Sequence, residues 1–217
     1  MIPFDDSNVI GQPAITLPLQ IIATVLDITI TGWSQVLANN EVSISSSERV
    51  IAGYLGRAMT AEKNRRPGLK KQIRIEEEVG TRSSPNSPKP EGRIDIKIIY
   101  SFDEAEYFGM ECKRVTGKNK RLAKKYVDEG VMRFVTGKYS PGHDWAAMLG
   151  FVIDGDNSGC TKLICNQLAR NQSTTCMEEN WTAETNFSLQ QDLYRTRHRQ
   201  HRQNLLMTIL HLFLIIQ

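Results

Sequence analysis

The residues best suited to chemistry lie in two apolar segments, 93–100 and 107–115, joined by a short acidic turn. Asp95 stands in the first segment, and Glu111 and Lys113 stand two positions apart in the second. Side chains two positions apart in a strand point to the same face, so Glu111 and Lys113 share one face. If both segments are strands that pair, Asp95 joins them, and two carboxylates and an ammonium group meet at one point.

Two carboxylates beside an ammonium group suit Mg²⁺ chemistry at a phosphate. Mg²⁺ prefers carboxylate oxygens and keeps several of its waters. Such an ion can make a water nucleophilic and take up the charge that develops on the phosphate. Lys113 could orient or deprotonate that water, or neutralise the developing charge.

The alternative is a solvated hairpin face with cross-strand ion pairs, formed by Asp95, Lys97, Glu111 and Lys113. The apolar neighbours of Glu111 favour the catalytic interpretation, because a buried carboxylate is costly unless a cation compensates it.

The elements that must position these residues follow from the apolar pattern. Helices are expected over residues 19–39, 45–65, 118–139 and 156–170, and strands over 72–79, 93–100, 107–115, 145–153 and from 205 onward. Alternation in the second strand puts three isoleucines on one face: Ile94, Ile96 and Ile98. Ser45 and Glu48 have capping-box spacing at the start of the second helix, and Asn157 or Ser158 is expected to cap the last one.

The remaining segments are expected to lack regular structure. Proline and serine predict irregular chain over residues 1–18 and a loop over 81–92. Residues 171–192 have the composition of a polar excursion, and an Arg/His-rich stretch follows at 195–202. No linker divides the chain, so we expect a single domain over 1–217.

Asp95, the fifteen residues after it and the sequence Glu111-Cys112-Lys113 resemble the PD-(D/E)xK phosphodiesterases, the restriction-endonuclease-like superfamily. The order of helix, strands and helix agrees over roughly residues 45–170, although Ile94 replaces the proline that often precedes the Asp. The resemblance implies an α/β (α+β) fold in which helices flank a central mixed β-sheet. Residues 1–44 would be an N-terminal extension to that core, and 171–217 a C-terminal excursion with the last strand.

The same resemblance implies a site and a cofactor. Metal-dependent cleavage of nucleic-acid phosphodiesters would use Asp95 and Glu111 as ligands of Mg²⁺, for which Mn²⁺ would substitute, and Lys113 as the catalytic lysine. Relatives often add a glutamate from the preceding helix, and Glu48 matches that role as a further catalytic residue and ligand. Glu48 could instead serve only as the capping partner of Ser45.

Basic residues follow the proposed site directly. Five lie around the start of the 118–139 helix, where they could contact a phosphate backbone or form a solvated helix face: Lys118, Lys120, Arg121, Lys124 and Lys125. Arg133 could reach the site or pair with Asp128 or Glu129. The 195–202 stretch could grip nucleic acid, bind an acidic partner protein or pair with the acidic N-terminal segment, and the sequence does not rank these roles.

Composition sets the limits of these hypotheses. With 40% apolar and 24% charged residues, the chain is neither disordered nor fibrous. The net charge of +3 hides an uneven distribution, because residues 1–48 contain no Lys or Arg. Four irregularly spaced cysteines indicate reduced thiols in an intracellular protein, and no segment reads as a signal peptide or membrane span. We therefore expect a soluble, cytoplasmic protein without a membrane partner.

The sequence thus predicts a nuclease that cuts DNA, with RNA not excluded. By resemblance and size it would be the cutting effector of a bacterial anti-phage defence or restriction system, working as a homo-oligomer, with a sensor protein, or both. The alternative is a non-catalytic nucleic-acid-binding or assembly subunit that retains the nuclease fold. A structural protein that binds no nucleic acid is the third possibility.

Overall fold

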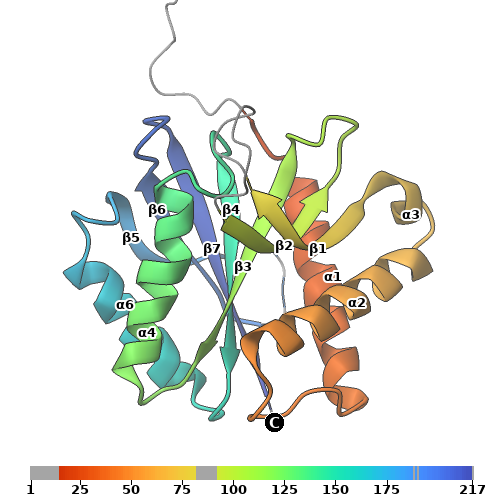
Figure 1. Cartoon of the computed structure of the whole chain (residues 1–217), viewed down its shortest axis with the longest axis horizontal. Helices are drawn as coiled ribbons and strands as arrows, with labels where there is room; N and C mark the ends of the chain where they lie inside the picture. The colour runs from red at the N-terminus through yellow and green to blue at the C-terminus, as the bar shows by residue number, and fades with distance from the viewer. Residues whose placement is uncertain (1–14, 82–91, 188, 190, 217) are drawn as a thin grey trace, which may run out of the picture.

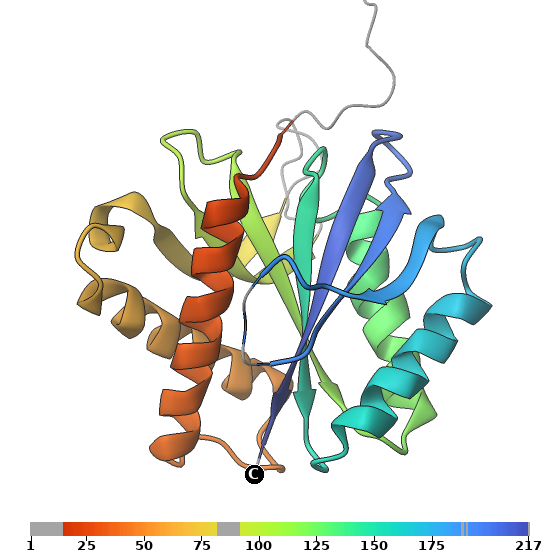
Figure 2. The same cartoon turned by 180° about the vertical axis from the view of Figure 1, so that it is seen from behind.

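A mixed sheet of seven strands, in the order β1-β2-β3-β4-β7-β6-β5, forms the centre of the protein (Figures 1 and 2). The computed structural model describes residues 15–81, 92–187, 189 and 191–216. Most of the expected 81–92 loop, and residues 1–14 of the expected irregular 1–18 segment, lie outside this range. The fold is α+β, with helices against an open sheet, as the sequence predicts.

Seven helical segments and seven strands make up the described part of the chain. The helical segments are α1 (Leu19–Ala38), α2 (Glu48–Arg65), α3 (Leu69–Gln72), α4 (Lys120–Tyr126), the π-helix η1 (Val127–Val131), α5 (Met132–Val135) and α6 (Asn157–Arg170). The strands are β1 (Arg74–Thr81), β2 (Gly92–Ile99), β3 (Tyr107–Val115), β4 (Trp145–Val152), β5 (Met177–Ala183), β6 (Leu193–Arg199) and β7 (Leu206–Ile215).

The type of pairing between neighbouring strands changes twice across the sheet. The β1–β2 and β2–β3 pairs are antiparallel, β3–β4 and β4–β7 are parallel, and β7–β6 and β6–β5 are antiparallel again. The parallel centre is buried on both faces, so β4 and β7 are almost continuously apolar, whereas β3 also carries Glu111, Lys113 and Arg114.

Two apolar cores lie on the two faces of the sheet. Side chains of α1 and α2 pack on one face, and those of α4, η1, α5 and α6 pack on the other. Within the described residues, α1 is the one helix long and apolar enough to cross a membrane by length and composition. Here it is a core helix, since Trp33 stacks on Phe151 of β4 at 5.6 Å and donates a hydrogen bond to the carbonyl of Ile215.

Both predicted helix caps are wrong. Ser47, not Ser45, caps α2, because the extended backbone of Ser47 turns its hydroxyl toward the Val50 amide. In α6 the cap is Asp156, whose carboxylate accepts from the Gly159 amide at 2.8 Å. In α6 the carboxylate of Asp156 was available one residue before the predicted Asn157, and an aspartate is as good a cap as asparagine or serine.

Three further predictions need correction. The expected 118–139 helix ends at Val135 and contains the π-helical segment η1. The expected polar excursion 171–192 contains β5, and the Arg/His-rich stretch contains most of β6. Ile94 packs in the core beneath α4, whereas Ile96 and Ile98 pack beneath α1 and α2, so the alternation of β2 breaks near Asp95.

Candidate active site

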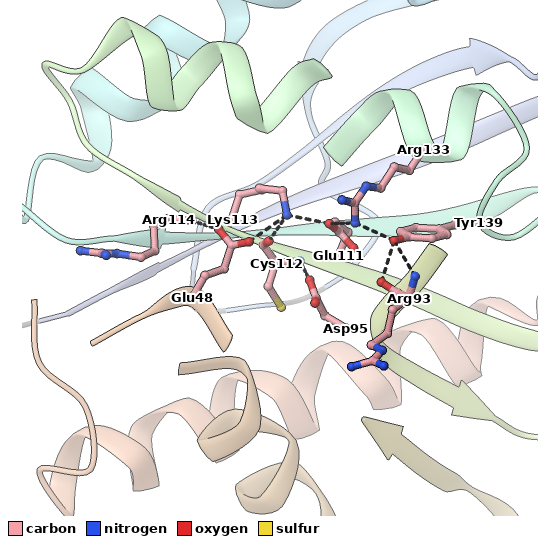
Figure 3. A network of polar contacts seen from close by, with 9 residues as sticks. All are labelled: Glu48, Arg93, Asp95, Glu111, Cys112, Lys113, Arg114, Arg133 and Tyr139. Carbon is pink, nitrogen blue, oxygen red and sulfur yellow. Dashed lines mark hydrogen bonds and ion pairs between the residues drawn. The ribbon is translucent and has the colours of Figure 1, made fainter. Parts of the chain in front are cut away.

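The site begins where β2 and β3 stop pairing. The register of the two strands runs from Ile99↔Tyr107 to Ile96↔Met110, and beyond that point the side chain of Asp95 replaces the backbone ladder. Its Oδ2 accepts a hydrogen bond from the Cys112 amide at 2.7 Å (Figure 3). The predicted convergence of Asp95 with the β3 residues is thus present, and Asp95 approaches from the widening gap between the strands.

Lys113 occupies the centre of the cluster. Its Nζ donates to Glu111 Oε1 at 2.6 Å, to Glu48 Oε1 at 2.9 Å and to the Cys112 carbonyl at 2.7 Å. The ammonium therefore links β3 to the first residue of α2, and the structure brings all four predicted catalytic residues together (Figure 3).

Glu48 reaches the cluster because α2 begins there. Its Oε2 accepts from the Arg114 amide at 3.0 Å, while its Oε1 contacts Lys113. Both oxygens thus have protein donors, and Glu48 fixes the lysine and the backbone of β3 at one point. Its predicted part as a metal ligand stays a prediction.

Arg133 joins the site from the other side of β3. Its guanidinium donates to Glu111 Oε1 at 2.8 Å and to the Tyr139 hydroxyl at 2.6 Å. Tyr139 in turn donates to the Arg93 carbonyl at 2.6 Å and accepts from the Arg93 amide at 3.2 Å. The sequence left the partner of Arg133 open between the site and two acidic neighbours, and gave no role to Tyr139.

The π-helix determines where Arg133 points. Each residue of an α-helix turns by about 100°, so the wider π turn shifts the direction of every later side chain. Gly130 lets this segment lie close to the site, since a Cβ there would come 2.3 Å from Met148 Cε and 3.6 Å from Lys113 Cγ. Neither feature has a recognisable sequence signal other than the glycine itself.

Burial dominates the electrostatics of the carboxylates. Glu111 is completely buried; its Oε2 has no donor among the described residues, and its carboxyl group lies within hydrogen-bond reach of the Asp95 carboxylate. Burial, with the nearby charge of Asp95, raises the pKa of Glu111 to about 8 despite the opposing effect of Lys113. Burial likewise raises the pKa of Asp95. Two crowded carboxylates with an unpartnered oxygen form a place that favours added positive charge.

Lys113 keeps its proton in this environment. Burial by itself would lower its pKa, but the charges of Glu111 and Glu48 and the hydrogen bond to Glu111 outweigh burial and raise the pKa above its usual value. An ammonium that holds its proton is a donor, so Lys113 is suited to orienting a ligand or stabilising negative charge and poorly suited to removing a proton.

The donor set fits a hard cation that needs few protein ligands. In the part of the chain that the structure describes, no three His, Cys, Asp or Glu side chains are grouped so as to hold a metal ion. Mg²⁺ is commonly bound through one or two carboxylates with waters and substrate phosphates completing the coordination. The unpartnered Glu111 Oε2 and the adjacent Asp95 carboxylate meet that requirement, and a tetrahedral zinc site would need more ligands.

The predicted phosphate-contacting residues lie at the start of α4. All five are exposed: Lys118, Lys120, Arg121, Lys124 and Lys125. Asn119 caps this helix, and Lys124 forms an ion pair with Asp128 one turn later. The described hydrogen bonds and ion pairs link none of the five to the carboxylate cluster, so their role in binding stays a prediction.

Fold and site together define an α+β protein with a carboxylate–lysine–arginine cluster at the point where two central strands separate. Comparison with known proteins adds no further identification: no family model matches the chain, and no curated protein or solved structure does so either. Any function must therefore be argued from the cluster itself.

Proposed function

We propose that the protein is a metal-dependent nuclease of the PD-(D/E)xK type that hydrolyses DNA phosphodiester bonds. One observation carries the proposal: the buried Oε2 of Glu111, which has no donor among the described residues, lies in a cluster that also holds Asp95, protonated Lys113 and Arg133. A buried carboxylate oxygen without a donor is an exception in an ion-pair network, and it calls for an added cation or proton beside Asp95.

Asp95 and Glu111 would hold the metal ion, with Glu48 as the auxiliary carboxylate. When bound, Mg²⁺ would supply a Lewis acid that activates water and offsets charge on the phosphate. Mn²⁺ would substitute because it favours the same oxygen ligands.

The chain's own cations would act on the phosphate. Lys113 is held by Glu48 and Glu111 within reach of any ligand of the carboxylates, where its ammonium would orient the attacking water or bind a non-bridging oxygen. Arg133 is anchored by Tyr139, and 32% of its side chain remains exposed, so its guanidinium would contact the phosphate of an incoming strand. Hydrolysis then adds the water oxygen to phosphorus and breaks one ester P–O bond.

The wider setting proposed for this activity rests on the resemblance alone. It is that of the cytoplasmic effector subunit of a bacterial anti-phage defence or restriction system, acting as a homo-oligomer or beside a sensor protein. RNA remains an alternative substrate, since the chemistry of the cluster is the same for both backbones.

Plasmid cleavage tests the proposal. Purified wild type should nick or linearise plasmid DNA in Mg²⁺ or Mn²⁺ and lose the activity in EDTA. The Glu111→Gln/Lys113→Met variant removes one negative and one positive group together, which limits the cost of leaving a buried charge unpaired. Its control is Glu178→Gln, which removes a half-exposed carboxylate of β5 that pairs with Arg199.

The expected result is full activity in the control and loss in the double variant, with both folded by circular dichroism. Equal cleavage by wild type and the folded double variant would show that the cluster is not the active site.

A second function is favoured by the same ion pairs. Glu111 Oε1 already accepts from both Lys113 and Arg133, and both oxygens of Glu48 have donors. A subunit that binds nucleic acid without cutting it could keep the cluster as a structural network. Such a protein would bind DNA equally well with and without Mg²⁺ and would leave the plasmid intact.

A further inference from the structure

The Arg/His-rich stretch divides into two parts with different surroundings. The arginines of β6 face glutamates of β5 and the chain just after it, in the pairs Arg199–Glu178, Arg197–Glu179 and Arg195–Glu184. Between them, His198 is completely buried and accepts or donates only to Thr175 and Thr196. The positive charges of this part of the stretch are therefore paired with glutamates at the β5–β6 edge of the sheet.

The second part is the tip of the β6–β7 hairpin. His201 and Arg202 are exposed there, and no hydrogen bond or ion pair of their side chains with a described residue is present. They border an open pocket of about 440 Å³, whose other lining residues are Thr136 and Lys138 from the turn after α5. Three of the four lining residues thus have basic side chains, and the fourth, Thr136, uses its hydroxyl to donate to the Met132 carbonyl.

The tip is held firmly against that turn. Gln200, which is 1% exposed, donates to the carbonyls of Phe134 and Ser140 and accepts from the Gly142 amide. The His201 amide donates to the Val135 carbonyl at 2.8 Å. Gly137 permits this approach, because its φ is +69° and a Cβ there would lie 2.7 Å from Gln203 Oε1. Buried polar contacts of this kind fix the position of the hairpin tip relative to the turn after α5. The fold therefore holds the backbone of the three basic residues close together.

The turn also connects the pocket to the candidate active site. The Tyr139 amide donates to the Arg133 carbonyl at 3.0 Å, which closes the turn and puts Lys138 next to the tyrosine that anchors Arg133. A Cβ on Gly92 would meet Lys138 Cε at 2.5 Å and the Tyr139 ring at 2.7 Å, so the start of β2 packs against both. Figures 1 and 2 show the β6–β7 hairpin and the end of the α4–α5 helical segment at the same end of the sheet.

We propose that the pocket of Lys138, His201 and Arg202 binds the backbone phosphates of the DNA strand that leads into the active site. The proposal rests on the proposed function for the identity of the polyanion. In this proposal the tip of the Arg/His-rich stretch contacts nucleic acid, and the arginines of β6 stabilise the sheet through their ion pairs. Hydrated phosphate suits an open pocket with basic side chains, since positive side chains release counterions from the DNA backbone when they contact it.

Binding of a fluorescently labelled DNA duplex, followed by anisotropy in EDTA so that no cleavage occurs, tests the proposal. The variant is Lys138→Gln/Arg202→Gln, and the matched control is Lys162→Gln/Arg170→Gln, which removes two charges from α6. The first variant should raise Kd about tenfold and reduce the slope of log Kd against log salt by about two, while the control leaves both unchanged. Plasmid cleavage in Mg²⁺ by the wild type and by the Lys162→Gln/Arg170→Gln control is measured alongside, which tests the proposed function separately from the pocket.

The other possible results separate the phosphate pocket from the proposed nuclease activity. If the two variants bind DNA alike and the wild type cuts, the phosphate pocket is refuted and the proposed function stands. If binding depends on Lys138 and Arg202 but the wild type never cuts, the pocket stands and the nuclease is refuted. If poly-glutamate displaces the duplex as well as unlabelled DNA does, the surface recognises acidic polypeptides and the proposal is overturned.

Discussion

The Tyr139 hydroxyl gives the sharpest test of how the site is held. Tyr139→Phe keeps the ring, which packs 5.2 Å from the Arg133 guanidinium, and removes only the oxygen. That oxygen accepts from Arg133 at 2.6 Å and from the Arg93 amide at 3.2 Å, and it donates to the Arg93 carbonyl at 2.6 Å. The substitution therefore changes the support of Arg133 without touching Glu111 or Lys113.

The expected stability cost follows from those three contacts. A net hydrogen bond contributes about 0.5–1.5 kcal/mol, and a buried group left without a partner costs about 1–3 kcal/mol. Arg133 keeps its contact with Glu111 and is partly exposed, so its share is small. We expect Tyr139→Phe to lower the free energy of unfolding by about 2 kcal/mol, measured by urea denaturation.

Tyr107→Phe is the matched control. Tyr107 is also buried, and its hydroxyl accepts from the fully buried Ser140 amide at 2.9 Å. Losing that bond leaves a buried amide without its partner and should cost about 1–3 kcal/mol. The two variants are therefore comparable in stability, but the hydroxyl of Tyr107 has no bond to Arg133.

Activity should separate the two variants. A guanidinium displaced by about 1 Å can cost up to about a hundredfold in rate, so we expect Tyr139→Phe to cut DNA about ten- to a hundredfold more slowly and Tyr107→Phe to cut at the wild-type rate. Equal rates for two equally destabilised variants would refute the positioning of Arg133 by Tyr139. A Tyr139→Phe variant as stable as wild type would refute the hydrogen-bond network itself.

Two further predictions concern stability alone. Ser47→Ala should lower the free energy of unfolding, measured in urea, by about 1 kcal/mol, whereas Ser45→Ala should change it by less than about 0.5 kcal/mol. A larger loss in Ser45→Ala than in Ser47→Ala would show that Ser45 is the cap, as the sequence predicts. Burial lowers the pKa of His198 to about 4 from its usual 6.5, so the stability it confers is complete above pH 6.5 and is lost as the pH falls toward 4. Urea titrations should show a loss of up to about 3 kcal/mol over that range, with a shallower pH dependence in His198→Gln, and an unchanged dependence would contradict the burial argument.

Local sequence patterns predicted the parts of the fold that local physics determines. The helix over 19–39, the buried strand over 145–153 and the two strands β2 and β3 lie where their apolar periodicities indicate. Glu111 and Lys113 share a face because strand geometry requires it, and that geometry holds whatever surrounds the strand. The four predicted catalytic residues are therefore neighbours in the structure.

Interactions between distant segments determined what the sequence could not show. Strands β5 and β6 are rich in charged residues, and they are stabilised by cross-strand ion pairs such as Arg197–Glu179, which no apolar pattern records. Arg133 reaches Glu111 only because a π-helical turn precedes it, and Tyr139 finds Arg133 only through a tight turn after α5. The side chain of Asp95 hydrogen-bonds to the backbone of β3 at the point where the backbone pairing between β2 and β3 ends.

The central claim is that Asp95 and Glu111 together hold a divalent cation beside Lys113. Crystals soaked in Mn²⁺, measured for anomalous scattering, test it most directly, with Glu111→Gln crystals as the control. We expect one strong peak about 2.1 Å from Glu111 Oε2 and from an Asp95 oxygen in the wild type, and its loss in the variant. A wild-type protein that cuts DNA in Mn²⁺ while its soaked crystals carry the ion elsewhere, or none at these carboxylates, would contradict it.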